Sequence, residues 1–159
     1  MVFEIHLTGS APLTTTDDFE EVVIGFLNQL GFFERGYDSN IDYKSLSKSV
    51  GGRLCVEYLF KYPERGFRVE ELAVALDTSK PAIYRHINKL KNMELVEEVD
   101  VPDEHGKPRK GYRLKYGNIV KAIYLVKEHA SLALDNYLKT AEHLQTLIER
   151  RSQLVNRKS

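Results

Sequence analysis

The chain has 159 residues, a formal net charge of zero and 42% hydrophobic residues, which suits one ordinary domain or a small domain with an appendage. No apolar run is long enough to cross a bilayer, and the N-terminus lacks the basic flank and apolar stretch of a signal peptide. The single cysteine, Cys55, excludes an internal disulfide and a multi-cysteine zinc site, so we expect a cytoplasmic protein.

Charge is unevenly distributed along the sequence. Residues 1–42 carry eight acidic residues and one basic residue, and the rest of the chain is correspondingly basic. A modest basic patch on a neutral protein permits specific DNA binding. It also predicts weak non-specific affinity and a strong dependence of binding on salt.

The N-terminal segment, residues 1–42, predicts a short strand followed by a helix. Residues 2–7 alternate apolar and polar side chains, which indicates the strand. Asp17 and Glu20 have the spacing of a capping box, and Gly31 is well placed to end the helix. We expect its buried face to hold Phe19, Val22, Val23, Phe26, Leu27 and Leu30.

Residues 32–41 read as an aromatic-rich loop, and a second helix is expected after it. The loop aromatics Phe32, Phe33 and Tyr37 more often fill a core than form a ligand box. The next helix starts at Asp42 or Ser45, and Pro63 and Gly66 end it. Its Gly51-Gly52 pair indicates a break, a kink or a close helix contact.

Residues 66–116 have the pattern helix, tight turn, helix, hairpin. The first helix opens at Val69 or Glu70 and buries Leu72, Ala73 and Leu76; residues 77–78 form the turn. The second helix spans residues 79–92, with Ser79 as N-cap and Pro81 in the first turn. Its buried residues are Ile83, Ile87 and Leu90.

The opposite face of the second helix carries the chemistry of a DNA reader. Arg85 and Asn88 are three residues apart and can bind guanine and adenine edges, respectively. Tyr84 can contact a phosphate or a thymine methyl, while Ser79 and Lys80 at the helix start are placed for phosphate. Lys89 adds a flanking charge. The alternative is that these residues are only a solvated helix face.

The hairpin at residues 100–113 is expected to form a wing. Lys107, Arg109 and Lys110 would lie along the DNA backbone or the minor groove. Asp103 and Glu104 at the same tip are unfavourable near phosphate. A plain solvent-exposed hairpin is the competing interpretation.

Residues 118–158 contain no proline or glycine and predict one long helix. Apolar residues alternate steps of four and three, which is the seam of a coiled coil. A second copy of the chain is the simplest partner, in an antiparallel or crossed pair whose orientation stays open. The expected interface comprises Ile119, Ile123, Val126, Ala130, Ala133, Tyr137, Leu144 and Leu147, in a seam that also includes Thr140, Arg151 and Leu154.

Other reactive side chains give weak signals. His86 borders the buried face of its helix, which favours a structural histidine, and His129 and His143 have no cysteine or carboxylate cluster near them in sequence. Cys55 is most simply a small buried residue. No nucleotide loop, dinucleotide fingerprint or nucleophile elbow is present, so we expect neither an enzyme nor a bound cofactor or metal.

Residues 66–116 resemble the winged helix-turn-helix regulators of the ArsR, MarR and TrmB type. The similarity rests on residues 69–76, 79–90, 93–96 and 112–114, and the long last helix resembles the dimerising helix of the TrmB-like group. The resemblance implies a homodimer that binds palindromic operators and controls transcription. The paired-cysteine signature of ArsR metal sensors is missing, so metal sensing is not implied.

The sequence therefore predicts a mainly α protein with a small β-hairpin wing. Its parts are an acidic segment (1–42), a winged helix-turn-helix (43–116) and a long dimerisation helix (117–159). Double-stranded DNA and a second copy are the expected partners, with the nucleoid as the place of action. A small-molecule or protein effector at residues 1–42, the operator, and activation or repression stay open. The rival interpretation is a winged-helix scaffold that binds protein in a transcription-related complex.

Overall fold

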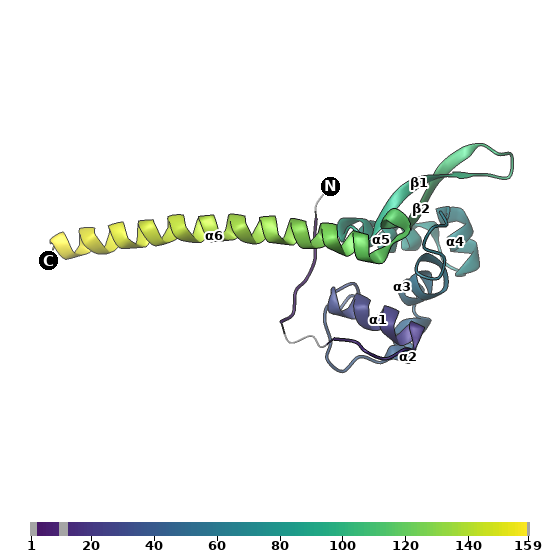
Figure 1. Ribbon diagram of the computed structural model, residues 1–159, viewed down its shortest axis with the longest axis horizontal. Helices are drawn as coiled ribbons and strands as arrows, with labels where there is room; N and C mark the ends of the chain where they lie inside the picture. Colours follow the sequence, from purple (N-terminus) through teal and green to yellow (C-terminus); the bar gives the residue numbers. More distant parts are fainter. Residues whose placement is uncertain (1–2, 10–12, 159) are drawn as a thin grey trace. The chain divides into compact units, whose positions relative to one another are not determined.

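The computed structural model describes residues 3–9 and 13–158, and the chain divides into two units, before and after the boundary between Ile123 and Tyr124. The first unit holds most of the elements, and the second consists of the greater part of the last helix (Figure 1). In chain order the elements are α1 (Phe19–Gln29), α2 (Tyr43–Lys48), α3 (Val50–Arg53), the π-helical segment η1 (Leu54–Leu59), α4 (Val69–Ala75), α5 (Lys80–Asn92), β1 (Val96–Pro102), β2 (Pro108–Leu114), the 3-10 turn η2 (Lys115–Gly117) and α6 (Ile119–Lys158).

The N-terminal segment forms the predicted helix but not the predicted strand. Residues 3–7 have no strand structure, and Val2 lies outside the described residues. The segment is instead attached to α5, because the backbone N–H of Glu4 donates a 2.9 Å hydrogen bond to the carbonyl of Asn92. A hydrogen bond to a helix end and the packing of Ile5 against the core replace the sheet ladder that the alternating pattern suggested.

Helix α1 begins one residue later than its capping pattern suggested. The N-cap is Asp18, whose side chain accepts a 2.9 Å hydrogen bond from the N–H of Glu21. Ile24 is fully buried, whereas Phe19, expected in the core, is 51% exposed. The buried face is therefore rotated from the predicted one. Gly31 ends the helix with φ of 75°, as expected.

The glycine pair allows two close approaches beside a helix break. The break lies at Ser49, which has an extended backbone and caps α3 by accepting from the N–H of Gly52. A Cβ atom on Gly52 would overlap the carbonyl oxygen of Leu46, and one on Gly51 would press on the rings of His86 and Phe32. Break and close contact thus occur together, and regular helix ends at Leu59, before the expected proline.

The helix-turn-helix forms as predicted. Helix α4 buries Leu72, Ala73 and Leu76, and Asp77 takes a left-handed conformation (φ 50°) in the turn. Ser79 caps α5. These elements share one core with α1 and the following loop; its buried members include Val23, Leu27, Phe32, Leu54, Leu59, Phe67, Leu72, Ile83, Ile87 and Leu90.

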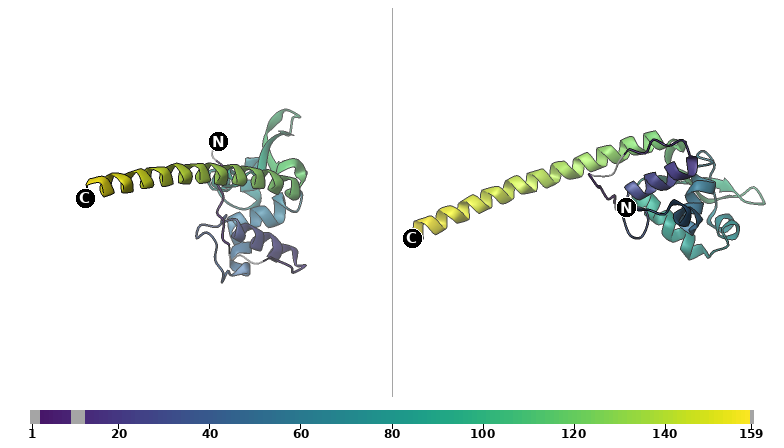
Figure 2. Two further views of the ribbon diagram at one scale, coloured as in Figure 1. Left: turned by 60° about the vertical axis from the view of Figure 1, so that its left-hand side comes forward. Right: turned by 90° about the horizontal axis from the view of Figure 1, so that it is seen from below.

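The predicted hairpin is present and is anchored to the core. Strands β1 and β2 pair antiparallel from Val96 opposite Leu114 to Pro102 opposite Pro108. Phe67 and Tyr112 exchange two backbone hydrogen bonds of 2.8 Å, which hold the base of the hairpin beside α4. The tip extends beyond this anchor (Figure 2).

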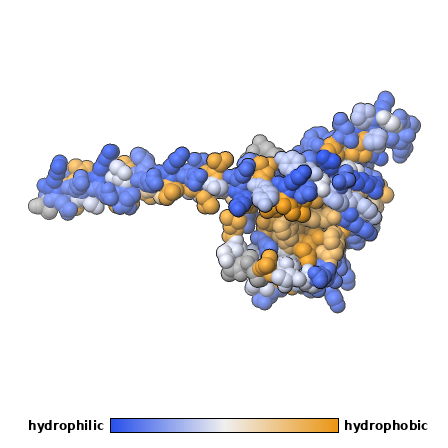
Figure 3. Space-filling model, in the orientation of Figure 1, coloured by the Kyte–Doolittle hydropathy of each residue, from blue (hydrophilic) through white to orange (hydrophobic). Residues whose placement is uncertain are grey.

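Helix α6 runs without interruption over 40 residues. Apolar side chains recur along its exposed surface from residue 132 onward (Figure 3). Its large exposed apolar residues after position 131 are Leu132, Leu134, Tyr137, Leu138, Leu144, Leu147, Ile148, Leu154 and Val155. No helix within the described part of the chain is both long and apolar enough to cross a membrane.

We expect Gly52→Ala to lower the free energy of unfolding by about 1–3 kcal/mol or more, because the new methyl group meets backbone rather than a movable side chain. Denaturant unfolding followed by circular dichroism measures the loss. Gly25→Ala is the matched control, since its nearest neighbour is a threonine side chain at 3.3 Å. Equal stability of the two variants would contradict the close contact between α2 and α3.

Candidate nucleic-acid interface

The outward face of α5 is open to solvent. Ile83, Ile87 and Leu90 are fully buried on the inward face. Tyr84, 39% exposed, and the exposed Arg85 and Asn88 lie on the opposite face. The structure thus brings together the three side chains that the sequence singled out, on a surface that the described residues do not cover.

The start of α5 is partly occupied by internal contacts. The hydroxyl of Ser79 accepts a 3.3 Å hydrogen bond from the N–H of Ala82, so it serves as a cap. The Nζ atom of Lys80 lies 4.0 Å from a carboxylate oxygen of Glu70, and both side chains are more than half exposed. An exposed pair of this kind contributes little to stability and exchanges easily.

The later part of α5 borders two hollows formed with the N-terminal segment. Arg85, Asn88 and Lys89 line one together with Glu4 and His6. Arg85 and Lys89 also line a larger cleft, of about 770 Å³, against residues 32–51. Lys89 places its Nζ atom 5.7 Å from the centre of the Phe32 ring. Arg85 makes no ion pair within the part of the chain that the structure describes.

His86 lies half-buried between the core and this larger cleft. Its ring centre is 6.0 Å from that of Phe32, and it packs over Gly51. Burial lowers the pKa of His86, and the neighbouring Arg85 lowers it further, so the ring is neutral at neutral pH. His86 therefore contributes packing rather than positive charge to α5.

The acidic residue at the hairpin tip organises the tip itself. Asp103 accepts 2.9 Å hydrogen bonds from the backbone N–H groups of His105 and Lys107 and from the Nε of Arg109. The bond from Arg109 is the main cause that lowers the pKa of Asp103. Its charge is thus paired with Arg109 and with the backbone of the tip in the free protein.

The basic residues of the hairpin differ in how far they are engaged. Arg109 is bound to Asp103, and Lys110 lies 3.4 Å from Glu98, which also binds Lys91 at 2.8 Å. Lys107 is exposed and makes no ion pair among the described residues.

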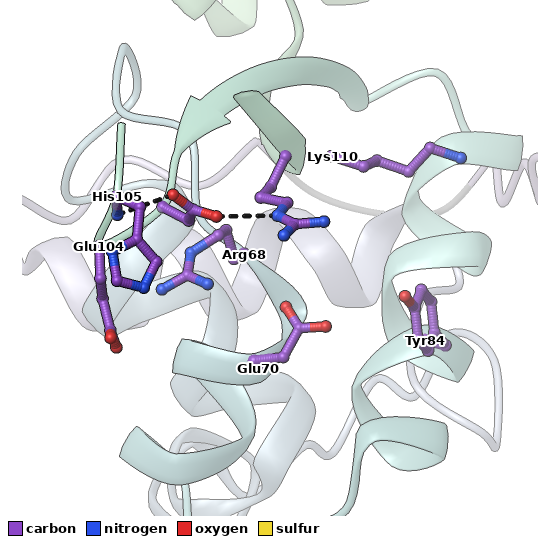
Figure 4. Close-up of a pocket in the computed structure, with 8 residues that line it drawn as sticks. Arg68, Glu70, Tyr84, Glu104, His105 and Lys110 are labelled. Atoms are coloured by element: carbon purple, nitrogen blue, oxygen red, sulfur yellow. Dashed lines mark hydrogen bonds and ion pairs between the residues drawn. The ribbon is translucent and has the colours of Figure 1, made fainter. Parts of the chain in front are cut away.

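A groove of about 430 Å³ lies between the hairpin tip and the two helices (Figure 4). It joins Tyr84 of α5 to Arg109 and Lys110 of the hairpin. The groove also contains Arg68, the residue before α4, which sequence reasoning missed because it belongs to neither the second helix nor the hairpin. Glu70 and Glu104 are its remaining charged lining residues besides Asp103.

The other reactive side chains occupy ordinary structural positions. Cys55 is fully buried, and burial raises the pKa of its thiol far above the usual range, which makes it unreactive. Within residues 3–9 and 13–158, no three His, Cys, Asp or Glu side chains are grouped so as to hold a metal ion.

Residues 64–98 match the model of the arsR family of bacterial regulatory proteins. This match confirms the expected winged helix-turn-helix relationship over α4, α5 and the start of β1, and such regulators bind DNA. The matched family is one of regulators, in agreement with the expectation that the chain is not an enzyme. No curated protein sequence matches the chain.

Solved structures show more distant similarity. A possible transcriptional regulator from Methanosarcina mazei Go1 is 15% identical, with 62% of this chain and 88% of that chain covered and a TM-score of 0.38. A point mutant of MepR from a multidrug-resistant clinical isolate of Staphylococcus aureus is 15% identical (92% and 100% covered, TM-score 0.35), and S. aureus MepR bound to ethidium bromide is 18% identical (89% and 96% covered, TM-score 0.34). Similarity at this level says nothing about function.

We expect Asp103→Ala to speed hydrogen exchange at the amides of His105 and Lys107 by about tenfold or more, since each loses its acceptor. NMR exchange measures this, and Asp103→Asn, which keeps a carbonyl acceptor, should show a smaller effect. In the natural chain the protection is present above the ordinary pKa of aspartate. It is lost only as the pH falls through the lowered pKa of Asp103. Unchanged exchange in the alanine variant would show that Asp103 does not order the tip.

Proposed function

We propose that the chain is a homodimeric transcription regulator that reads double-stranded DNA with α5. In this proposal residues 79–92 enter the major groove, and the hairpin, residues 100–113, follows the backbone or the minor groove. Such a regulator acts on the nucleoid in the cytoplasm. The observation that carries the proposal is the open face of α5 with Tyr84, Arg85 and Asn88, beside a groove that continues to the hairpin.

Each exposed side chain has a distinct role in this proposal. Arg85 binds the O6 and N7 atoms of a guanine, and Asn88 binds the N6 and N7 atoms of an adenine. Tyr84 contacts a phosphate or a thymine methyl. The residues that hold phosphate or flank it are Ser79, Lys80, Lys89, Lys107, Arg109, Lys110 and, added by the structure, Arg68.

Ion pairs within the free protein make DNA binding depend on how well a DNA site matches the protein surface. Lys80, Arg109 and Lys110 each face a carboxylate in the free protein, so DNA must replace these partners. Phosphate can do so at little cost at Lys80 and Lys110, because both members of each pair are well exposed, whereas Arg109 would have to leave the largely buried Asp103. The exchange weakens binding to arbitrary DNA and favours sites where Arg85 and Asn88 also find their bases.

We propose that a small-molecule effector binds residues 1–42 in the larger cleft beside α5. Phe32, Phe33 and the loop after them form one side, and Arg85 and Lys89 the other. Both basic side chains also belong to the proposed DNA face. A molecule that engaged them in the cleft would withdraw them from DNA, so binding of effector and DNA would be coupled.

A protein-binding scaffold is the second candidate function. The carboxylates of Glu70, Glu98, Asp103 and Glu104 lie around the hairpin and offset much of its positive charge. A nearly neutral exposed helix face can equally bind a protein partner. The two functions differ in their response to salt, because only DNA binding releases counterions from phosphate.

We expect Arg85→Ala to weaken DNA binding by about 1–3 kcal/mol and to relax preference for one base pair. Lys89→Ala should instead reduce affinity for all sequences and lower the slope of log K against log salt by about one. Fluorescence anisotropy at several salt concentrations measures both effects, with sites first selected from random duplex DNA. Lys139→Ala, in the exposed part of α6, is the control that should bind normally. No affinity of the natural chain for any duplex at low salt would favour the scaffold.

We expect the double variant Ala133→Glu and Leu144→Glu to be monomeric, because two charges would enter the seam of the α6 pair. Analytical ultracentrifugation measures the mass. Ser131→Glu and Gln145→Glu, which lie outside the seam, form the matched control and should leave the dimer intact. A natural chain that sediments as a monomer, or a dimer that survives both seam substitutions, would contradict pairing through α6.

A further inference from the structure

We infer that the second copy binds α6 in the antiparallel direction, with the two-fold axis beside residue 142. The inference rests on the homodimer proposed above and adds its orientation and register. It depends on three columns of side chains along α6. The seam comprises Ala130, Ala133, Tyr137, Thr140, Leu144, Leu147, Arg151 and Leu154.

The two columns that flank the seam differ in character. The apolar column follows the seam by one residue and comprises Leu134, Ala141, Ile148 and Val155. The polar column precedes the seam by one residue and comprises His129, Asn136, His143 and Arg150. Leu134, Ile148 and Val155 are 55%, 46% and 66% exposed in the single chain, so the apolar column needs a cover as much as the seam does.

This asymmetry selects the direction of pairing. In a parallel pair, the column after the seam packs against the column before the seam of the partner. Leu134 and Ile148 would then lie against the histidines at 129 and 143 of the partner helix, and Val155 against the arginine at 150. In an antiparallel pair each column lies against the same column of the second helix. The apolar side chains then cover one another, and the polar side chains stay together on the side exposed to water. The antiparallel direction therefore buries more apolar surface without trapping polar groups.

Side-chain sizes within the seam select the register. With the axis at residue 142, Arg151 lies opposite Ala133 and Leu154 opposite Ala130 of the partner helix. Leu144 faces Thr140 in the same way, so large side chains meet small ones in these layers. A parallel pair would place Arg151 against Arg151 and Ala133 against Ala133, which sets like charges together in one layer and leaves a void in another.

The usable length of the seam agrees with this register. Val126 is already 5% exposed in the single chain, so the exposed apolar surface runs from about residue 130 to residue 155. An axis at residue 142 overlaps the whole of that range with itself. A shift by one heptad in either direction would leave two seam residues at each end without a partner in this range.

The charges at the end of α6 also oppose a parallel pair. Residues 149–158 carry Arg150, Arg151, Arg157 and Lys158 and a single acid, Glu149. A parallel pair would bring both basic ends together. The antiparallel pair instead places each basic end along residues 126–135 of the partner, which carry two acids, Glu128 and Asp135, and one base, Lys127. Salt screens this term, so it supports the orientation and does not set it alone.

Disulfide mapping tests the orientation directly. We expect Ala130→Cys and Leu154→Cys, coexpressed with different tags, to form a linked heterodimer under mild oxidation. In this register the two positions face each other in one layer, and a disulfide needs Cα atoms about 4.4–6.8 Å apart. Neither variant alone should link, because each lies about 36 Å along the axis from its own copy. The natural chain is the background control, since Cys55 is buried and unreactive.

The register has its own control. Leu154→Cys with Tyr137→Cys should not link, whereas a shift by one heptad would pair them. Self-linking of Leu154→Cys in a dimeric sample would overturn the antiparallel direction, and linking to Tyr137→Cys would overturn the register. Either result leaves the homodimer and its DNA binding standing. A monomer by sedimentation would remove the proposed homodimer itself, while anisotropy would still report DNA binding separately.

Discussion

The burial of one face of α5 is the constraint on which the rest of the structure depends. Ile83, Ile87 and Leu90 have no exposed surface, and burying each such side chain contributes about 1.5–3 kcal/mol. Because a helix repeats every 3.6 residues, this anchoring leaves little freedom for the other faces. Tyr84, Arg85 and Asn88 must point outward, on a helix that the core holds rigidly.

The N-terminal segment takes part in this anchoring despite its acidic composition. Asn28 uses its amide to bind both the N–H and the carbonyl of Asp38, at 3.0 Å each, which folds the aromatic loop back onto α1. Phe32 then lies under α5, in contact with His86, while Gly51 leaves room for both rings. The segment is thus built into the core beside α5, and the same loop forms one wall of the larger cleft.

Many basic side chains of this protein form ion pairs with nearby carboxylates. Five of the basic residues of α5 and the hairpin face carboxylates, namely Lys80, Lys91, Arg109, Lys110 and Arg113, and Asp103 also accepts the hydrogen bonds of the tip. The surface around α5 and the hairpin is consequently less positive than its basic residues alone suggest. A DNA-binding protein of this kind gains affinity when phosphates replace these carboxylates and when its side chains contact base edges. Arg85 and Asn88 therefore matter more for binding than the net charge of the surface does.

The sequence by itself determined the elements whose periodicity and caps agree. It determined α4, α5 with its Ser79 cap, the hairpin and the uninterrupted α6, because in each the local propensity and the burial pattern favour the same element. Which side of α5 faces outward followed from the same periodicity. The specific contacts predicted for the site and for the α6 interface stay predictions.

Only the tertiary structure decided matters that join distant residues. Residues 3–7 alternate like a strand but have no strand beside them, so they attach to Asn92 instead. Asp18 rather than Asp17 caps α1, and packing against the core places Ile24 inward and Phe19 outward. Arg68 entered the site because the hairpin folds over the start of α4, and Asp103 turned out to order the tip. In each case the deciding partner lies outside the local pattern, and packing and hydrogen bonding across the fold selected it.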